Sequence, residues 1–317
     1  MKKLIYLLMS LSFVAFVSCN DDKDNPVNNE NTRTENSNGG NGGSNDNGSQ
    51  LSNDSQPKNG SQPGNVAENS SSVVYYSGKE GGRSYVDLGL TSGTKWATCN
   101  VGATKPEEYG NYYAWGEVIP KTEYTADNYK YSHGFDGYIK YSGYYNNIGY
   151  NSFYDNKYVL ELIDDVVYVN WGGKWRMPTN KQTEELLKEC YWVWTDSYNG
   201  SGVIGFIVYK AKSSIDKGQK IYKGDKLNSQ YSLSDAHIFL PSAGMWKVFL
   251  LEGVGVSGDY WSSSLDYDYA PNTSSGPMIF YNSDFAIVLG FLARYLYDGR
   301  VLRRYGLPVR AVIPGNK

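Results

Sequence analysis

An abrupt change of composition at Val73 limits what this chain of 317 residues can fold into. Residues 19–72 are dominated by Asn, Ser, Gly, Asp, Gln and Pro. Such a segment buries too little apolar surface to offset the entropy cost of ordering its backbone. We therefore predict a disordered tether over 19–72, with an end-to-end distance on the order of 40 Å. One folded domain over 73–317 is predicted to follow it.

The first 18 residues have the form of an export signal. Two lysines precede an apolar run from Leu4 to Val17, which is too short to span a bilayer as a mature helix. The sequence Phe16-Val17-Ser18-Cys19 is similar to the cleavage site of bacterial lipoproteins, in which the thiol of the Cys receives lipid. We predict a signal peptide over 1–18 and a lipid anchor on Cys19. An ordinary secreted protein is the alternative.

An acidic cluster follows Cys19 in the stretch Asn20-Asp21-Asp22-Lys23-Asp24. It resembles the surface-export signal of lipoproteins in Bacteroidetes-type bacteria. The resemblance implies an outer-membrane lipoprotein that faces the cell exterior. A solvated run of charges is the alternative interpretation.

Charge and aromatic content narrow the class of partner. The net charge of −3 does not provide the basic surface that nucleic-acid binding requires. The 30 Tyr and 8 Trp supply large, stiff, amphipathic contact area, which favours recognition of sugars or protein surfaces. Filling of the core is the alternative for any one of these side chains, and Trp115, Trp171 and Trp175 are predicted to be core residues.

The domain is predicted to be α+β, with few short helices early and β-hairpins late. Thr179 to Gln182 has the pattern of a capping box, and an apolar stripe of Leu186, Leu187 and Cys190 follows it. A second short helix is expected to start near Asp164 and Asp165 and to end at Gly172-Gly173. Strands are expected over 278–281, 285–289 and 308–313, with a turn at Asp298-Gly299.

Cys99 and Cys190 are the two cysteines that remain if Cys19 carries lipid. An oxidising compartment allows a disulfide between them. Two buried free thiols are the alternative.

Several sequence blocks resemble one known family. They are the stretch 85–103, which begins Tyr-Val-Asp-Leu-Gly-Leu; Tyr-Tyr-Ala-Trp-Gly-Glu at 112–117; Asn-Trp-Gly-Gly-Lys-Trp-Arg-Met-Pro-Thr at 170–179; Phe-Leu-Pro-Ser-Ala-Gly at 239–244; and Gly-Asp-Tyr-Trp-Ser-Ser-Ser at 258–264. The blocks and their order are similar to the Fibrobacter succinogenes major paralogous domain family. That resemblance implies a C-type-lectin-like fold, related to the C-terminal domain of the Legionella collagen-like adhesin, whose C-terminal hairpins display a binding surface.

The resemblance and the aromatic content together place the predicted ligand-binding residues in the C-terminal third. These residues are Tyr260, Trp261, Tyr267, Tyr269, Asn272, Tyr281, Asn282 and Asp284. Within 267–305, the stretches 285–292 and 303–305 depart from the polar, Asn-rich pattern of the family. One hypothesis is a recognition face that varies between isolates. Ordinary drift or buried strands are the alternative.

Catalytic and metal patterns are weak. No Cys follows Cys190, whereas the enzymatic relatives of this fold use a reactive Cys pair near the C-terminus. His133 and His237 are far apart and lack a metal-binding spacing. We predict no enzyme activity, no metal site and no cofactor, although a structural calcium ion bound by dispersed oxygens leaves little sequence trace.

The prediction for function is therefore non-covalent, adhesin-like recognition of a glycan or a surface protein by a lipid-anchored domain. A structural or tip subunit of a surface fibre or outer-membrane complex is the rival. A polysaccharide-acting enzyme is the least favoured reading.

Overall fold

The computed structural model describes residues 75–132, 138–142, 155, 157–228, 230–266 and 284–315. All of them belong to one compact unit, Gly60–Lys317. This part of the chain is mostly β-sheet with few helices, which is compatible with the predicted α+β class. No helix among these residues is long and apolar enough to cross a membrane.

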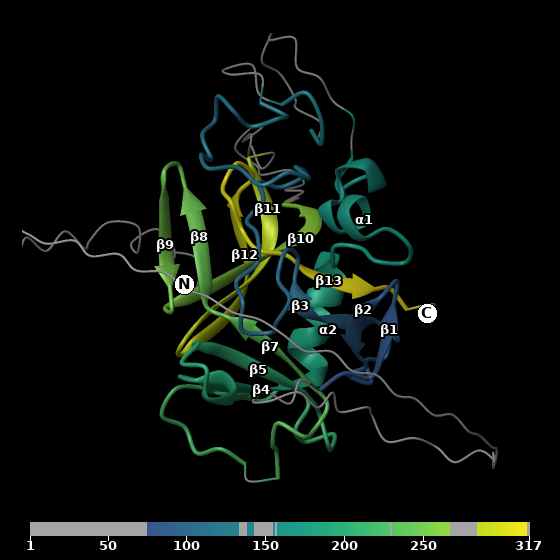
Figure 1. Cartoon of the computed structure of the whole chain (residues 1–317), viewed down its shortest axis with the longest axis vertical. Helices are drawn as coiled ribbons and strands as arrows, with labels where there is room; N and C mark the ends of the chain where they lie inside the picture. Colours follow the sequence, from purple (N-terminus) through teal and green to yellow (C-terminus); the bar gives the residue numbers. More distant parts are fainter. Residues whose placement is uncertain are drawn as a thin grey trace, which may run out of the picture. The chain divides into compact units, whose positions relative to one another are not determined.

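The described residues of this unit form three sheets (Figure 1). The first is four-stranded, in the order β1-β2-β3-β13, with β1 Gly78–Glu80, β2 Arg83–Val86, β3 Lys95–Asn100 and β13 Arg310–Ile313. The second is five-stranded, in the order β12-β11-β10-β8-β9, with β8 Ala243–Lys247, β9 Leu250–Val254, β10 Ser257–Leu265, β11 Phe285–Leu292 and β12 Tyr295–Leu302. The third is four-stranded, in the order β6-β4-β5-β7, with β4 Cys190–Thr195, β5 Gly205–Lys210, β6 Lys220–Ile221 and β7 His237–Pro241.

Helix α2, Asn180–Glu189, confirms the predicted capping box. The Thr179 side chain accepts from the Gln182 amide, and the Gln182 side chain accepts from the Thr179 amide at 2.9 Å. Leu186 is fully buried and Leu187 packs against the same core cluster. The apolar stripe is therefore a core contact, as predicted.

The second predicted helix is also present, as the 3-10 turn η2, Leu162–Asp164, followed by α1, Val166–Trp171. Asp165 caps α1, because its carboxylate accepts from the amides of Val167 and Tyr168. Gly172 ends the helix with a φ of 69°, a conformation that favours glycine.

The predicted turn at Asp298-Gly299 is wrong. Both residues lie inside β12, which pairs with β11 over its whole length, and the hairpin turns at Ala293 and Arg294 instead. Packing within β12 accounts for the glycine, because a Cβ at Gly299 would lie 2.7 Å from the ring of Tyr297 on the same strand. Strand β13 confirms the predicted closing strand, whereas the strand predicted over 278–281 lies outside the described residues.

Two buried arginines tie distant segments together. The Arg310 guanidinium donates to the Asn100 side chain at 2.8 Å and to the carbonyl oxygen of Phe239 at 2.8 Å, so it links β13 to β3 and β7. Arg303 lies inside an aromatic cage, with its Cζ atom 4.2 Å from the centre of the Tyr138 ring and 5.0 Å from that of Trp115. Its side chain is fully buried.

Candidate functional site

A hollow of about 360 Å³ opens where the third sheet meets two turns of the five-stranded sheet. We call it the Trp194 hollow. Its lining comes from the end of β4, the residue before β5, the loop after β6, the β9–β10 turn and the β11–β12 turn. The lining residues are Trp194, Asp196, Ile204, Lys223, Gly255, Val256, Leu292, Ala293 and Arg294.

Backbone hydrogen bonds hold the walls of this hollow in place. The Lys223 amide donates to the carbonyl oxygen of Ala293 at 3.0 Å, which joins the loop after β6 to the β11–β12 turn. The Gly255 amide donates to the carbonyl oxygen of Ser242 at 2.8 Å. Gly255 has a φ of 73°, which a residue with a side chain rarely adopts. Backbone hydrogen bonds between separate segments therefore hold the walls of the hollow, so that its shape depends on several elements.

Trp194 supplies the aromatic wall. Its ring packs edge to face with Phe206, with centroids 5.1 Å apart, and its indole Nε1 donates to Asp196 Oδ1 at 2.9 Å. Phe206 is fully buried, so the inner side of the indole is anchored on the core. A fixed indole beside a hollow is a surface on which the apolar face of a ligand can stack.

Charged groups stand beside this wall. Asp196 Oδ1 also accepts from Lys223 Nζ at 3.1 Å. The hydrogen bonds from Trp194 and Lys223 hold the pKa of the Asp196 carboxyl below its usual value. Arg294 is exposed at the hairpin tip and forms no ion pair with any other described residue. Apolar walls with polar groups at the margin are typical of ligand-binding hollows.

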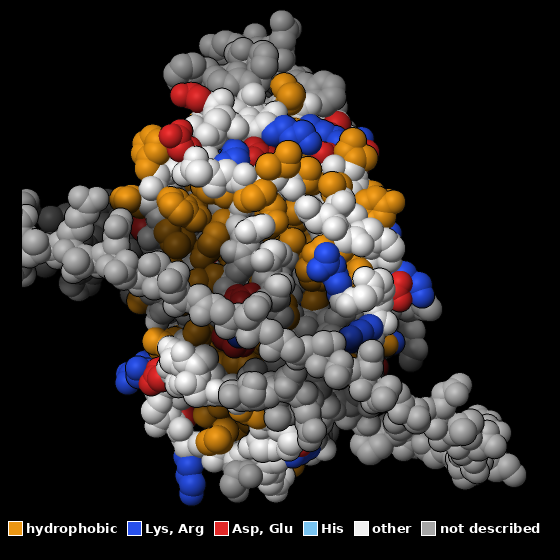
Figure 2. All heavy atoms as spheres, in the orientation of Figure 1, with side chains coloured by type: hydrophobic (Ala, Val, Ile, Leu, Met, Phe, Trp, Pro, Cys, Tyr) orange, Lys and Arg blue, Asp and Glu red, His pale blue; other side chains and the backbone are white. Residues whose placement is uncertain are grey.

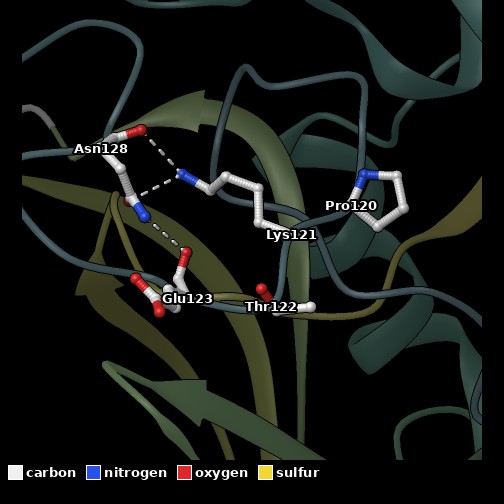
Figure 3. Close-up of a pocket in the computed structure, with 5 residues that line it drawn as sticks. All are labelled: Pro120, Lys121, Thr122, Glu123 and Asn128. Atoms are coloured by element: carbon white, nitrogen blue, oxygen red, sulfur yellow. Dashed lines mark hydrogen bonds between the residues drawn. The ribbon is translucent and has the colours of Figure 1, made fainter.

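A second hollow is lined by residues of a single loop, Pro120, Lys121, Thr122, Glu123 and Asn128, and has a volume of about 550 Å³ (Figure 3). Its polar groups bind one another: Lys121 Nζ donates to Asn128 Oδ1 at 3.2 Å, and Asn128 Nδ2 donates to the Glu123 carbonyl oxygen at 3.0 Å. It contains no aromatic side chain. We therefore do not assign a binding role to it.

Two of the predicted ligand-binding residues are core residues. Tyr260 is 2% exposed and Trp261 is fully buried, and both lie on the central strand β10. Their polar atoms form hydrogen bonds within the protein. The Tyr260 hydroxyl donates to the carbonyl oxygen of Pro241 at 2.8 Å, and the Trp261 indole donates to the carbonyl oxygen of Tyr113 at 2.7 Å. The prediction that they contact a ligand is wrong, because β10 is buried on both faces.

Asp284, the one other predicted ligand residue within the described ranges, is not brought to the Trp194 hollow. Asp284 is half-buried, and its carbonyl oxygen accepts from the Arg303 amide at 2.8 Å. It precedes β11, so the length of that strand, at about 3.3 Å per residue, separates it from Leu292 by about 25 Å. The five remaining positions, Tyr267, Tyr269, Asn272, Tyr281 and Asn282, lie outside the described residues.

The proposed variable segment is partly buried. Strand β11 alternates toward the core and is almost wholly buried in its second half, and Arg303 is fully buried. Within 285–305, the alternative of buried strands therefore accounts for the apolar run of β11. The exposed positions of 285–305 are Leu292, Arg294 and Tyr295 around the hairpin tip and Asp298 and Arg300 on β12.

Of the two alternatives for the cysteines, the disulfide is not formed, because Cys99 and Cys190 are both free thiols. Cys190 is fully buried in the cluster that also contains Leu186, and burial raises the pKa of its thiol above the usual value. Cys99 is half-buried on β3, with its Sγ atom 3.5 Å from the Thr98 hydroxyl. The two thiols thus have separate surroundings.

His237 is a core residue. Its Nε2 lies 2.9 Å from the Tyr198 hydroxyl and its Nδ1 lies 2.8 Å from the carbonyl oxygen of Asp235, while burial lowers the pKa of the imidazole. His133 lies outside the described residues. Within the described ranges, no group of three or more His, Cys, Asp or Glu side chains is arranged to hold a metal ion.

Sequence reasoning missed an unusual carboxylate next to Tyr260. Asp259 is 1% exposed, its Oδ1 accepts from the Tyr297 hydroxyl at 2.8 Å, and its Oδ2 has no hydrogen-bond partner among the described residues. Burial raises its pKa to about 6, while the Tyr297 hydrogen bond and Lys247 act in the opposite direction. A buried carboxylate with a free oxygen is costly to the fold.

The β8–β9 hairpin carries exposed apolar side chains, and Figure 2 shows hydrophobic side chains over this region. Phe249 is 60% and Leu250 is 65% exposed at its tip. Strand β9 ends the order of the five-stranded sheet. This hairpin is an edge to which another strand can add.

Comparison with known proteins provides no identification: models of protein families, curated proteins and solved structures all gave no match to this chain.

Proposed function

We propose that this chain is a lipid-anchored surface protein whose domain binds a glycan non-covalently in the Trp194 hollow. The single observation that carries the proposal is the hollow itself, in which an indole anchored on Phe206 stands beside Asp196, Lys223 and Arg294. Sugars present an apolar ring face together with hydroxyl groups that need hydrogen-bond partners. The indole suits the first and the charged side chains suit the second.

The sequence supports the setting of this proposal. The export signal, Cys19 and the polar tether over 19–72 are features of a protein held at a membrane with its domain away from the surface. The resemblance to the Fibrobacter succinogenes major paralogous domain family supports a C-type-lectin-like fold. We propose the outer membrane, facing the exterior, as the location.

A glycan array with the full chain, purified in detergent micelles, tests the proposal. Binding to a related set of sugars that is lost in Trp194→Ala and kept in Trp171→Ala would support it. Trp171 is a matched control, because it is also half-buried and packs edge to face against another aromatic ring, that of Trp175, at 5.2 Å. A blank array, or equal loss in both variants, would contradict it. Runs with calcium and with chelator test a metal requirement.

A second candidate function is assembly, in which β9 of one copy pairs with β9 of another. The exposed edge and the apolar tip at Phe249, Leu250 and Leu251 favour it. Sedimentation of the full chain in detergent would show dimers that Leu250→Lys dissociates. A monomer at all concentrations would leave recognition as the better reading.

A further inference from the structure

We infer that the ligand of the Trp194 hollow carries an acidic group, a carboxylate or a sulfate on a sugar ring, and that Arg294 binds it. The inference rests on the proposed function, because it names the class of glycan that the same hollow takes. It concerns a residue at the hairpin tip that no motif in the sequence singled out.

The charges that line the hollow are unequal. Lys223 and Arg294 are cationic, and Asp196 is the one negatively charged residue among the described residues that line the hollow. The chain as a whole has a net charge of −3, so the hollow differs in sign from the average of the protein. A local excess of positive charge attracts anions and disfavours cations.

The negative charge of Asp196 is already engaged. Its Oδ1 accepts from both the Trp194 indole and Lys223 Nζ, at 2.9 and 3.1 Å. Asp225, in the turn after β6, does not line the hollow, and its Oδ2 accepts from the Tyr222 amide at 2.9 Å. Arg294 therefore keeps its guanidinium available, with no ion pair to any described residue.

The apolar walls of the hollow strengthen the attraction between Arg294 and an anion. Val256 is 60% and Leu292 is 39% exposed, and together with Ile204 they form the apolar sides of the hollow. A ligand seated between them excludes water, which lowers the local dielectric constant and strengthens the attraction between a guanidinium and an anion. A guanidinium binds carboxylate and sulfate oxygens through paired hydrogen bonds, so it selects acidic sugars over neutral ones.

Titration of the full chain in detergent with three probes tests the inference: a neutral cello-oligosaccharide, an oligogalacturonate, which carries carboxylates and no sulfate, and a κ-carrageenan oligosaccharide, which carries sulfates and no carboxylate. We expect at least one acidic probe to bind about tenfold or more tightly than the neutral one, with an affinity that falls as salt is added. The two acidic probes distinguish carboxylate from sulfate as the recognised group.

Variants make the outcome decisive. Arg294→Ala should raise the Kd for the acidic probe about tenfold and that for the neutral probe by much less, while Arg294→Lys restores part of the affinity for the acidic probe. Arg304→Ala, at the other end of β12, is the control and should bind normally. Equal binding of all probes, or an unchanged Kd in Arg294→Ala combined with loss in Trp194→Ala, overturns the inference and leaves the proposed function intact. Absence of binding to every sugar overturns both.

Discussion

The Arg303 cage and the Trp194 hollow use the same kinds of side chain in opposite ways. In the cage, Trp115, Tyr129 and Tyr138 surround a guanidinium that belongs to the protein itself. The guanidinium also donates to the Tyr129 hydroxyl and to the carbonyl oxygens of Lys140 and Tyr141, at 3.0 Å each. In the hollow, one indole and a cation at the margin leave space between them.

The comparison teaches that aromatic and cationic residues do not indicate a binding site by themselves. The guanidinium in the cage is fully buried, so the aromatic and polar groups around it contact the protein itself and stabilise the fold. The hollow has an exposed guanidinium and an aromatic wall, which the proposed ligand would contact. Exposure and the presence of a partner within the protein separate the two roles.

Loss of the caged cation should have the largest effect. Arg303→Ala leaves a cavity and unpaired buried oxygens, and we expect it to lower the free energy of unfolding by about 3–5 kcal/mol. Denaturant unfolding of the full chain measures this. Arg294→Ala is the matched control and should change stability by less than about 0.5 kcal/mol. Equal effects of the two substitutions would remove the distinction between cage and hollow.

The two tryptophans should differ in a similar way. Trp175 is 1% exposed and its indole donates to the Glu80 carbonyl oxygen at 2.9 Å, so Trp175→Ala should cost about 3–5 kcal/mol and unfold much of the protein. Trp194→Ala removes a half-buried ring and should cost about 1–2 kcal/mol. Thermal unfolding compares them. A cost at Trp194 as large as at Trp175 would mean that the indole belongs to the core.

A change of pH should alter the stability of the fold through Asp259 in the five-stranded sheet and not through the Arg303 cage. The pKa of Tyr129 in the cage is raised to about 12, chiefly by burial, whereas that of Asp259 on β10 is raised to about 6. Because the folded state raises the Asp259 pKa from 3.8, its protonation stabilises the fold below about pH 4, and this stabilisation is lost as the pH rises through 6.

Asp259→Asn should remove that pH dependence. We expect a gain of about 1–2 kcal/mol at pH 7, because a shift of about two pKa units is worth about 3 kcal/mol and an unpaired buried amide costs part of it. Unfolding curves between pH 4 and 8 measure the effect. An unchanged slope with pH in the variant would show that another group titrates.

The smallest effect is expected at the ion pair of the hollow. The side chains of Asp196 and Lys223 are 55% and 53% exposed, so Asp196→Ala should change stability by less than about 0.5 kcal/mol. The same variant frees Lys223 and should tighten binding of an acidic sugar. Weaker binding instead would show that Asp196 orients Trp194 in a way that the ligand needs.

Local signals predicted the helices well, and long-range packing limited the rest. Thr179 and Asp165 were readable because a cap depends on residues a few positions away. The turn predicted at Asp298-Gly299 is wrong because these residues pair with strand β11 and pack against Tyr297. The two-residue turn pattern contains no information about either contact. Tyr260 and Trp261 were misplaced because an aromatic pair on a strand gives no sign that both faces are covered.

The candidate site was not predicted, since its lining comes from turns spread between Trp194 and Arg294. The one available signal was Trp194 followed two residues later by Asp196 at the end of a strand, which places both on one face. The contacts that bring Lys223 and Arg294 beside them depend on how two sheets meet.

The Arg310 clamp has a consequence for the order in which the fold can be completed. Its hydrogen bond to Asn100 joins residues 210 positions apart in the chain. Strand β3 therefore lacks its neighbour β13, and the carbonyl oxygen of Phe239 lacks its donor, until residues 310–313 have been synthesised. A ribosome-bound chain would lack this hydrogen bond until that point, which would suit the export before folding that we propose for this chain.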